Sequence, residues 1–342
     1  MDSPHVTEEL LQDSTSKDYK RFKFYMIWLI FPLLYGTKMF IIELIKWNEL
    51  WIIFIEQLAL IIWSLLCAIG FWSHLHVKWD KMLLLSSITG LANTVVNTLI
   101  IYATKLNQQS GGSPGAMNSI LMFNVVVLLI FGIILFNEHH TCRQYAGAAI
   151  IFLAIIVLTV SRSFEKTDTH TGQQNNQYLF SVGIIFSAAC VNSIPGVAGK
   201  YAMYFHNCDP INYSIQVLLV SGLSGSAIYL YIYAFQVPLE LAESQSVFFA
   251  IMSSTIWGIL STIGYIVYYV AASKGPVEIV QLLWNMKIIV QIIEEFIFLG
   301  ILPTILSFIS IALGLFGLVL IIFSKVAHRE VSDVTSTNIE MT

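Results

Sequence analysis

The sequence predicts an all-α membrane protein whose ten transmembrane helices form two inverted five-helix repeats. Three observations lead to this fold class. Of the 342 residues, 56% are hydrophobic and only 11% are charged, whereas soluble domains carry about 25% charged residues. Apolar segments recur along the whole chain, and a helix of about 20 apolar residues is long enough to cross a bilayer. One polar stretch divides these segments into two equal sets.

The two chain ends are predicted to be cytoplasmic tails. Residues 1–23 are polar and lack the short apolar core and the cleavage site of a secretory signal. Residues 325–342 are rich in Ser and Thr. The four cysteines form neither a paired framework nor a CxxC motif, so we interpret them as packing residues. The net charge of -4 gives no indication of nucleic-acid binding.

Ten apolar segments follow the amino-terminal tail. Most of them are joined by only a few residues, which makes consecutive helices antiparallel. The predicted spans are residues 24–45, 50–72, 82–103, 115–136, 144–161, 178–205, 213–236, 247–272, 277–299 and 303–324.

The longest connection, residues 162–177, separates a first five-helix repeat (24–161) from a second (178–324). Because five is odd, the second set starts on the opposite side of the membrane, as in the inverted repeats of many secondary transporters. The halves also share a local pattern: IYATK at 101–105 and VAASK at 270–274 each precede a glycine turn and a proline, Pro114 or Pro276. Each proline opens a span, a position that suits it.

The distribution of basic residues predicts the orientation, since cytoplasmic loops carry an excess of Lys and Arg. With the amino terminus in the cytoplasm, eleven of the seventeen Lys and Arg residues fall on the inner side and five on the outer side, and Lys287 lies within a span. Both termini are therefore expected in the cytoplasm. Whether the membrane is the plasma membrane or an internal one is not indicated.

The ninth segment carries polar residues where a lipid anchor would have none. A charge at the bilayer centre costs about 2.5–3.5 kcal/mol on insertion scales, so these side chains must face protein or water. At about 100° per residue, the polar residues form two faces, Glu278, Gln281 and Asn285 on one and Lys287, Gln291 and Glu294 on the other. We expect Lys287, Asn285 and Gln281 to bind a solute. The alternative is an internal ion pair of Lys287 that only fixes helix packing, and we interpret Glu294 and Glu295 as interfacial.

Other spans contribute further candidates for solute binding. Asn93 and Asn97 lie one turn apart on the third span, and Asn118 lies beside the proline that opens the fourth. Interhelical hydrogen bonding is the alternative for these amides, and aromatic packing is the alternative for the eighth-span candidate Tyr265. Lys38 on the first span is expected to extend to the outer surface rather than into the cavity.

Three prolines are candidate hinges or gates. Pro195 interrupts the sixth span, where it removes a backbone hydrogen bond and bends the helix; the bend could also only fit curved packing. Pro114 and Pro276 lie in the turns described above. The small residues of Ser221–Ser226 permit close contact between helices.

No motif of catalysis or of metal binding accompanies these residues. Histidines occur in three inner loops, but contiguous pairs lack zinc-ligand spacing, so no metal site and no cofactor are expected. The chain also lacks HExxH, a Walker loop and a complete nucleophile elbow. We therefore do not expect an enzyme.

Ser113–Asn118, the corner Asn137-Glu138 and Arg143–Gly147 resemble the end of an EamA-type repeat, the unit of the drug/metabolite transporter superfamily. Asn137 stands where the family pattern has glycine. Residues 276–322 resemble the second copy, with Leu299-Gly300 in place of the acidic corner. The resemblance implies a ten-helix transporter whose cavity is lined by helices 1, 3, 4, 6, 8 and 9. Family members carry nucleotide sugars, phosphorylated sugars, amino acids, purines, drugs or magnesium, and no motif here chooses among these.

These observations together predict a secondary transporter that moves a small polar organic metabolite by alternating access. Lys287 would face an anionic group or a proton-coupling partner, the amides would hydrogen-bond the solute, and the prolines would permit rocking. One alternative is a divalent-cation transporter that uses Glu43, Glu56 or Glu294, and another is a non-transporting receptor or scaffold. The expected partners are the solute and the lipid bilayer, with a homodimer also compatible with the sequence.

Overall fold

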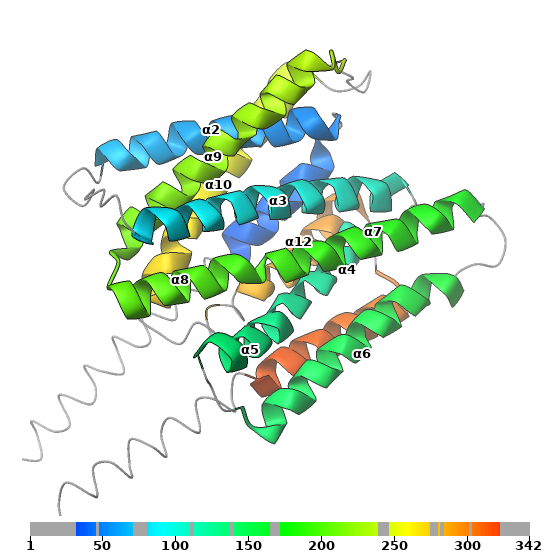
Figure 1. Cartoon of the computed structure of the whole chain (residues 1–342). Helices are drawn as coiled ribbons and strands as arrows, with labels where there is room; N and C mark the ends of the chain where they lie inside the picture. The colour runs from blue at the N-terminus through cyan, green and yellow to red at the C-terminus, as the bar shows by residue number, and fades with distance from the viewer. Residues whose placement is uncertain are drawn as a thin grey trace, which may run out of the picture.

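The computed structural model describes residues 32–45, 48–70, 81–109, 113–136, 140–164, 172–238, 246–273, 280, 284–300 and 303–321. All regular secondary structure in these ranges is helical (Figure 1). The predicted tails, Gln281 and Pro276 lie outside the described residues.

The helices follow the predicted segments in order. A first helix covers residues 32–44, and a last one covers 305–321. Between them lie α2 (Glu49–Gly70), α3 (Lys81–Gln109), α4 (Pro114–Asn118), the 3-10 helix η2 (Ser119–Met122), α5 (Phe123–Phe136), α6 (Cys142–Phe164), α7 (Gly172–Val191), α8 (Ser193–His206), α9 (Pro210–Ala234), α10 (Val247–Ala272), α12 (Lys287–Glu294) and the π-helix η3 (Glu295–Leu299). Some boundaries differ: α3 continues beyond its predicted end at residue 103, and α6 and α7 extend into the predicted linker 162–177.

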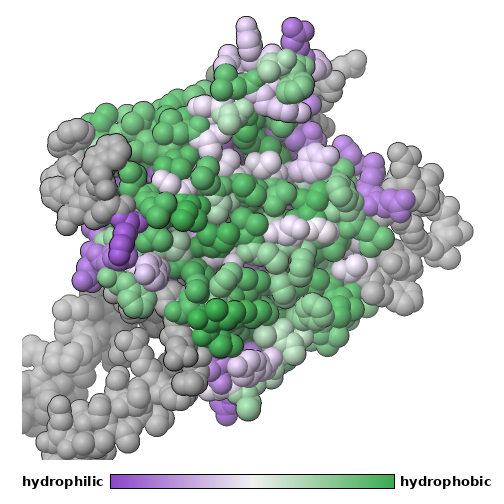
Figure 2. Space-filling view, viewed as in Figure 1, coloured by the Kyte–Doolittle hydropathy of each residue, from purple (hydrophilic) through white to green (hydrophobic). Residues whose placement is uncertain are grey.

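Seven helices in the described ranges are long and apolar enough to cross a membrane. They are Glu49–Gly70, Lys81–Gln109, Pro114–Leu135, Cys142–Thr159, Asn176–Met203, Pro210–Ala234 and Val247–Val270. They correspond to the second to eighth predicted spans, and their length and composition indicate an integral membrane protein. The visible face is largely apolar, with hydrophilic residues gathered toward its margins (Figure 2). The described part of the first, ninth and tenth predicted spans is shorter than this length.

Local chemistry explains where several helices begin. Ser113 caps α4 by accepting a hydrogen bond from the Ala116 amide at 3.2 Å, and Pro114 occupies the first turn, as predicted. Asp209 caps α9 in the same way, at 2.8 Å from the Asn212 amide.

The sixth predicted span corresponds to α7 and α8, which run on in line (Figure 1) with a single turn residue, Asn192, between them. Pro195 is the third residue of α8 and follows this turn directly. The Ser193 hydroxyl donates to the carbonyl of Cys190 at 2.6 Å, on the other side of the turn.

Glycines allow the central helices to approach closely. α2 packs against α9 and α10, and α3 packs against α7, α8 and α9. A Cβ atom at Gly225 of α9 would lie 2.3 Å from the Cβ of Gln57 in α2, and one at Gly90 of α3 would lie 2.8 Å from the Val217 carbonyl oxygen of α9. The close contact predicted for the small residues of Ser221–Ser226 is thus confirmed.

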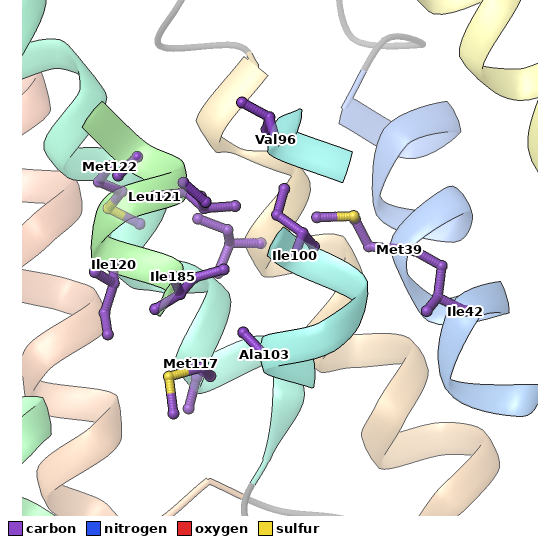
Figure 3. Packing of buried hydrophobic residues seen from close by; sticks show 14 of the residues in the cluster. Met39, Ile42, Val96, Ile100, Ala103, Met117, Ile120, Leu121, Met122 and Ile185 are labelled. Atoms are coloured by element: carbon purple, nitrogen blue, oxygen red, sulfur yellow. The ribbon is translucent and has the colours of Figure 1, made fainter. Parts of the chain in front are cut away.

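One apolar core surrounds the carboxyl-terminal half of α3. In Figure 3, side chains of α3 lie between the first helix on one side and α4 with η2 on the other. The labelled residues are Val96, Ile100 and Ala103 of α3, Met39 and Ile42 of the first helix, Met117, Ile120, Leu121 and Met122 of α4 and η2, and Ile185 of α7. A second core gathers the aromatic residues that border the candidate site.

Candidate functional site

Two lysines are buried between the first helix and α12. Lys38 is 2% exposed and Lys287 is 3% exposed. The helices can approach because Gly36 faces Val290 and the carbonyl of Lys287, where a Cβ atom would lie 2.4 Å from Val290. The expectation that Lys38 extends to the surface is therefore wrong. Its side chain points inward because aromatic rings there receive the ammonium group.

Aromatic rings surround both ammonium groups. The Lys38 nitrogen lies 4.2 Å from the centroid of the Trp257 ring and 5.0 Å from that of Tyr35. The Lys287 nitrogen lies 4.8 Å from the centroid of Trp284 and 5.7 Å from that of Tyr35. We call these five residues the lysine–aromatic cluster. A desolvated cation over such a ring gains about 2 kcal/mol, and Tyr35 serves both cations.

Tyr265, predicted as a solute-binding residue, extends this cluster. The centroid of its ring lies 6.1 Å from that of Tyr35 and 5.8 Å from that of Trp284. The centroids of the Tyr35 and Trp284 rings are 4.1 Å apart. Gly264 leaves room for Tyr35, because a Cβ atom there would lie 1.9 Å from the ring. The aromatic packing proposed as the alternative for Tyr265 is therefore present in the structure.

Glu56 of α2 joins Asn97 to the lysine–aromatic cluster. Asn97 donates to Glu56 Oε1 at 3.1 Å, and Gln57 donates to Glu56 Oε2 at 3.0 Å. The buried Glu56 carboxylate also interacts electrostatically with Lys38. Asn97 thus makes an interhelical hydrogen bond, which was the alternative to solute binding. Its acceptor, Glu56, is the carboxylate that interacts with Lys38.

Lys287 has no comparable acidic partner. Within the described ranges, its ammonium group forms neither a hydrogen bond nor an ion pair, and its electrostatic neighbour is Lys38, a like charge. The internal ion pair proposed as the alternative for Lys287 is therefore not found among these residues.

Two predicted amides are buried with polar atoms that lack partners. Asn285 is fully buried, and neither its oxygen nor its nitrogen has a hydrogen bond to a described residue. The side-chain nitrogen of Asn93 is also buried without a hydrogen bond to a described residue. Buried amides without partners are costly, so these atoms are suited to a ligand.

A second polar group, which we call the carboxyl cluster, comprises Glu43, Glu295, Gln291, Asn118 and Ser113. The Asn118 nitrogen donates to Gln291 Oε1 at 3.0 Å, and Gln291 Nε2 donates to Glu43 Oε1. Glu295 accepts from the Ser113 hydroxyl at 2.8 Å. Asn118, which was predicted to bind solute, therefore orients Gln291.

Glu295 differs from its sequence-based interpretation. It was expected at the membrane interface, but it is fully buried. The chain passes from α-helix to π-helix at this residue, and Gly115 of α4 donates its backbone N–H to the carboxylate at 2.5 Å. Glu294 instead accepts from the Thr37 hydroxyl at 2.7 Å and is only half-buried.

The structure thus brings together Lys287 and Tyr265 and connects Asn97 to them through Glu56 and Lys38. Asn118 and Pro114 belong to the other end of the site, around the carboxyl cluster. The residues that sequence-based reasoning did not place in the site are Lys38, Glu56, Tyr35, Trp257 and Trp284. Charged residues inside apolar segments were the available signal for the first two.

No metal centre is indicated by the described residues, since they hold no group of three or more His, Cys, Asp or Glu side chains that could bind an ion. The cysteines that the structure describes are free thiols.

Comparison with known proteins shows the fold alone. No family model matches the chain, and no curated protein matches it. Twenty-eight chains of solved structures match. One crystal structure superposes with a TM-score of 0.59 over 87% of this chain and 96% of its own, at 13% sequence identity.

Proposed function

We propose that this chain is a secondary transporter that moves a small organic anion across a membrane by alternating access. The observation that carries the proposal is the burial of Lys38 and Lys287 among aromatic rings, with Glu56 as acidic partner for Lys38 alone.

The charge balance of this site favours an anionic solute. An uncompensated charge within a bilayer costs several kcal/mol. Glu56 offsets one of the two ammonium groups, and no described carboxylate pairs with the other. The anionic group of a solute would supply the missing charge, with Lys287 as its main contact. The unpaired amides of Asn285 and Asn93 would hydrogen-bond the solute.

Reciprocal helix contacts support the proposed inverted repeat of residues 24–161 and 178–324. Helix α3 of the first half packs against α9 of the second, and α10 of the second packs against α2 of the first. Gly147 of α6 and Gly317 of the last helix approach each other's backbone. Pro195, next to the turn at Asn192, and Pro114 remain proposed hinges, and Gln281 and Pro276 keep their predicted roles.

A binding screen with the purified full chain tests the proposal across several classes of solute. Phosphorylated sugars, nucleotides and carboxylates would be compared with neutral sugars and amines by thermal unfolding. A ligand at a concentration 100 times its Kd stabilises the native state by about 2.7 kcal/mol. We expect an anion to stabilise the wild type, Lys287→Ala to lose this effect and Lys287→Arg to retain part of it.

The exposed Lys81 of α3 provides a matched control. Lys81→Ala removes the same charge and should leave the ligand effect unchanged. Saturable uptake of the stabilising anion into liposomes would then establish transport. If no anion stabilises the protein, or if Lys287→Ala responds like the wild type, the proposal is wrong.

The same experiments separate the two alternatives. A divalent-cation transporter would move cations and lose flux when Glu43, Glu56 or Glu294 is neutralised. A receptor or scaffold would bind without transporting and would tolerate Lys287→Ala.

A further inference from the structure

The carboxyl groups of Glu43 and Glu295 meet inside the protein. Glu43 is 6% exposed and Glu295 is 0% exposed. Gln291, one helical turn before Glu295, donates to Glu43, and the two carboxyl groups interact with each other. They belong to the first helix and to η3, which are distant in sequence. Two ionised carboxylates in such a contact repel each other strongly, so a buried pair of this kind shares one proton.

The hydrogen bonds around the pair indicate where that proton is held. Glu295 accepts from the Gly115 amide through Oε1 and from the Ser113 hydroxyl through Oε2. Glu43 accepts from Gln291 through Oε1. Its other oxygen, Oε2, is buried without a partner among the described residues. An ionised carboxylate only accepts hydrogen bonds, whereas a protonated carboxyl group can also donate one. This oxygen is therefore available to carry the shared proton.

The surrounding charges agree with one bound proton. Lys105 of α3 interacts electrostatically with Glu43, and its ammonium group donates to the carbonyl of Ile45 at the end of the first helix. With one proton shared by the pair, the two carboxyls and Lys105 together are neutral, whereas without it they carry one uncompensated negative charge. Glu294, the other acidic residue beside the pair, accepts from Thr37.

We infer that Glu43 and Glu295 form a proton-binding site that joins the first helix to η3 and α4. Binding of the proton from water gives one hydrogen-bonded carboxylic acid and one carboxylate. Its release leaves two carboxylates, whose repulsion separates the first helix from η3. The start of the π-helix at Glu295 is consistent with such a role, because π-bulges are frequent at functional sites. The role of this proton as a coupling ion rests on the proposed carrier function, but the binding site itself does not.

Infrared spectroscopy of the full chain in liposomes detects the proton directly, through the carbonyl band of a protonated carboxylic acid. At neutral pH we expect an acid band equivalent to one carboxyl group per chain that is lost in both Glu43→Gln and Glu295→Gln. The amide of glutamine has nearly the shape of a carboxylic acid and can donate in its place, so both variants should fold. Glu294→Gln and Glu56→Gln are the controls, and each should leave this band in place.

If neither Glu43→Gln nor Glu295→Gln changes the acid band, the inference is overturned. If one of these variants does not fold, the acid band of the other variant tests the inference. A second measurement uses linkage: a proton bound only in the folded state makes stability fall as pH rises. The unfolding temperature of the wild type should thus fall between neutral and alkaline pH more steeply than that of Glu43→Gln, and equal slopes would count against the site. Since neither measurement needs a solute, failure of the proton site and failure of the transport proposal give different results.

Discussion

The contact between Gly264 and Tyr35 offers a direct test of the packing around the lysine–aromatic cluster. A methyl group added by Gly264→Ala would place its carbon 1.9 Å from one ring atom of Tyr35, with two further ring atoms at 2.7 and 2.9 Å. Tyr35 is 1% exposed, and its ring centroid lies 4.1 Å from that of Trp284, so the ring has little space into which it can move.

The expected magnitude follows from two opposing effects. Overpacking a well-packed core costs about 1–3 kcal/mol. Replacing glycine by alanine inside a helix gains about 0.5–1 kcal/mol. We therefore expect Gly264→Ala to lower the free energy of unfolding by up to about 2.5 kcal/mol, estimated from these two ranges.

Gly183 of α7 is the matched control, because a Cβ atom there would meet no described atom within 4 Å. Gly183→Ala should be neutral or stabilising by about 0.5–1 kcal/mol. Both variants would be compared with the wild type by thermal unfolding in the same detergent, with tryptophan fluorescence as the readout. If Gly264→Ala is as stable as Gly183→Ala, Tyr35 is not held as described.

Substitutions at three further positions test other contacts by the same unfolding measurement. Asn97→Ala removes a donor from the buried Glu56 carboxylate and should cost about 1–3 kcal/mol; an unchanged stability would show that Glu56 does not depend on it. Asp209→Ala removes the cap of α9 and should cost about 0.5–2 kcal/mol, whereas Asp209→Asn, which can still cap, should lose much less. Gly90→Ala introduces contacts under 3.0 Å with α9 and should cost about 1–3 kcal/mol, and a stabilising effect would contradict the close approach of α3 and α9.

Much of the helical structure could be predicted from the sequence because membrane spans follow from hydrophobicity alone. The second to eighth spans occur where they were predicted, and Pro114 opens its helix as expected. Helix ends were less predictable, because α3, α6 and α7 continue through polar residues that hydropathy assigns to loops.

The environment of individual charges could not be predicted in the same way. The position of Lys38 in the outer half of its span suggested the surface, but only the fold brings Trp257, more than two hundred residues away, over its ammonium group. Glu295 was misplaced for the same reason, since its partners Ser113 and Gly115 come from the other half of the chain. The sequence contained the charged residues of both clusters but not their pairing.

The first helix takes part in both clusters, and so does the segment formed by α12 and η3. Lys38 and Glu43 lie on the former, and Lys287, Gln291 and Glu295 lie within little more than two turns of the latter. A displacement that parts Glu43 from Glu295 must therefore also change the distance between Lys38 and Lys287. Coupling of this kind is reciprocal by thermodynamic necessity. Under the two proposals, the factor by which a solute bound at the lysines changes the affinity for the proton equals the factor by which the proton changes the affinity for the solute.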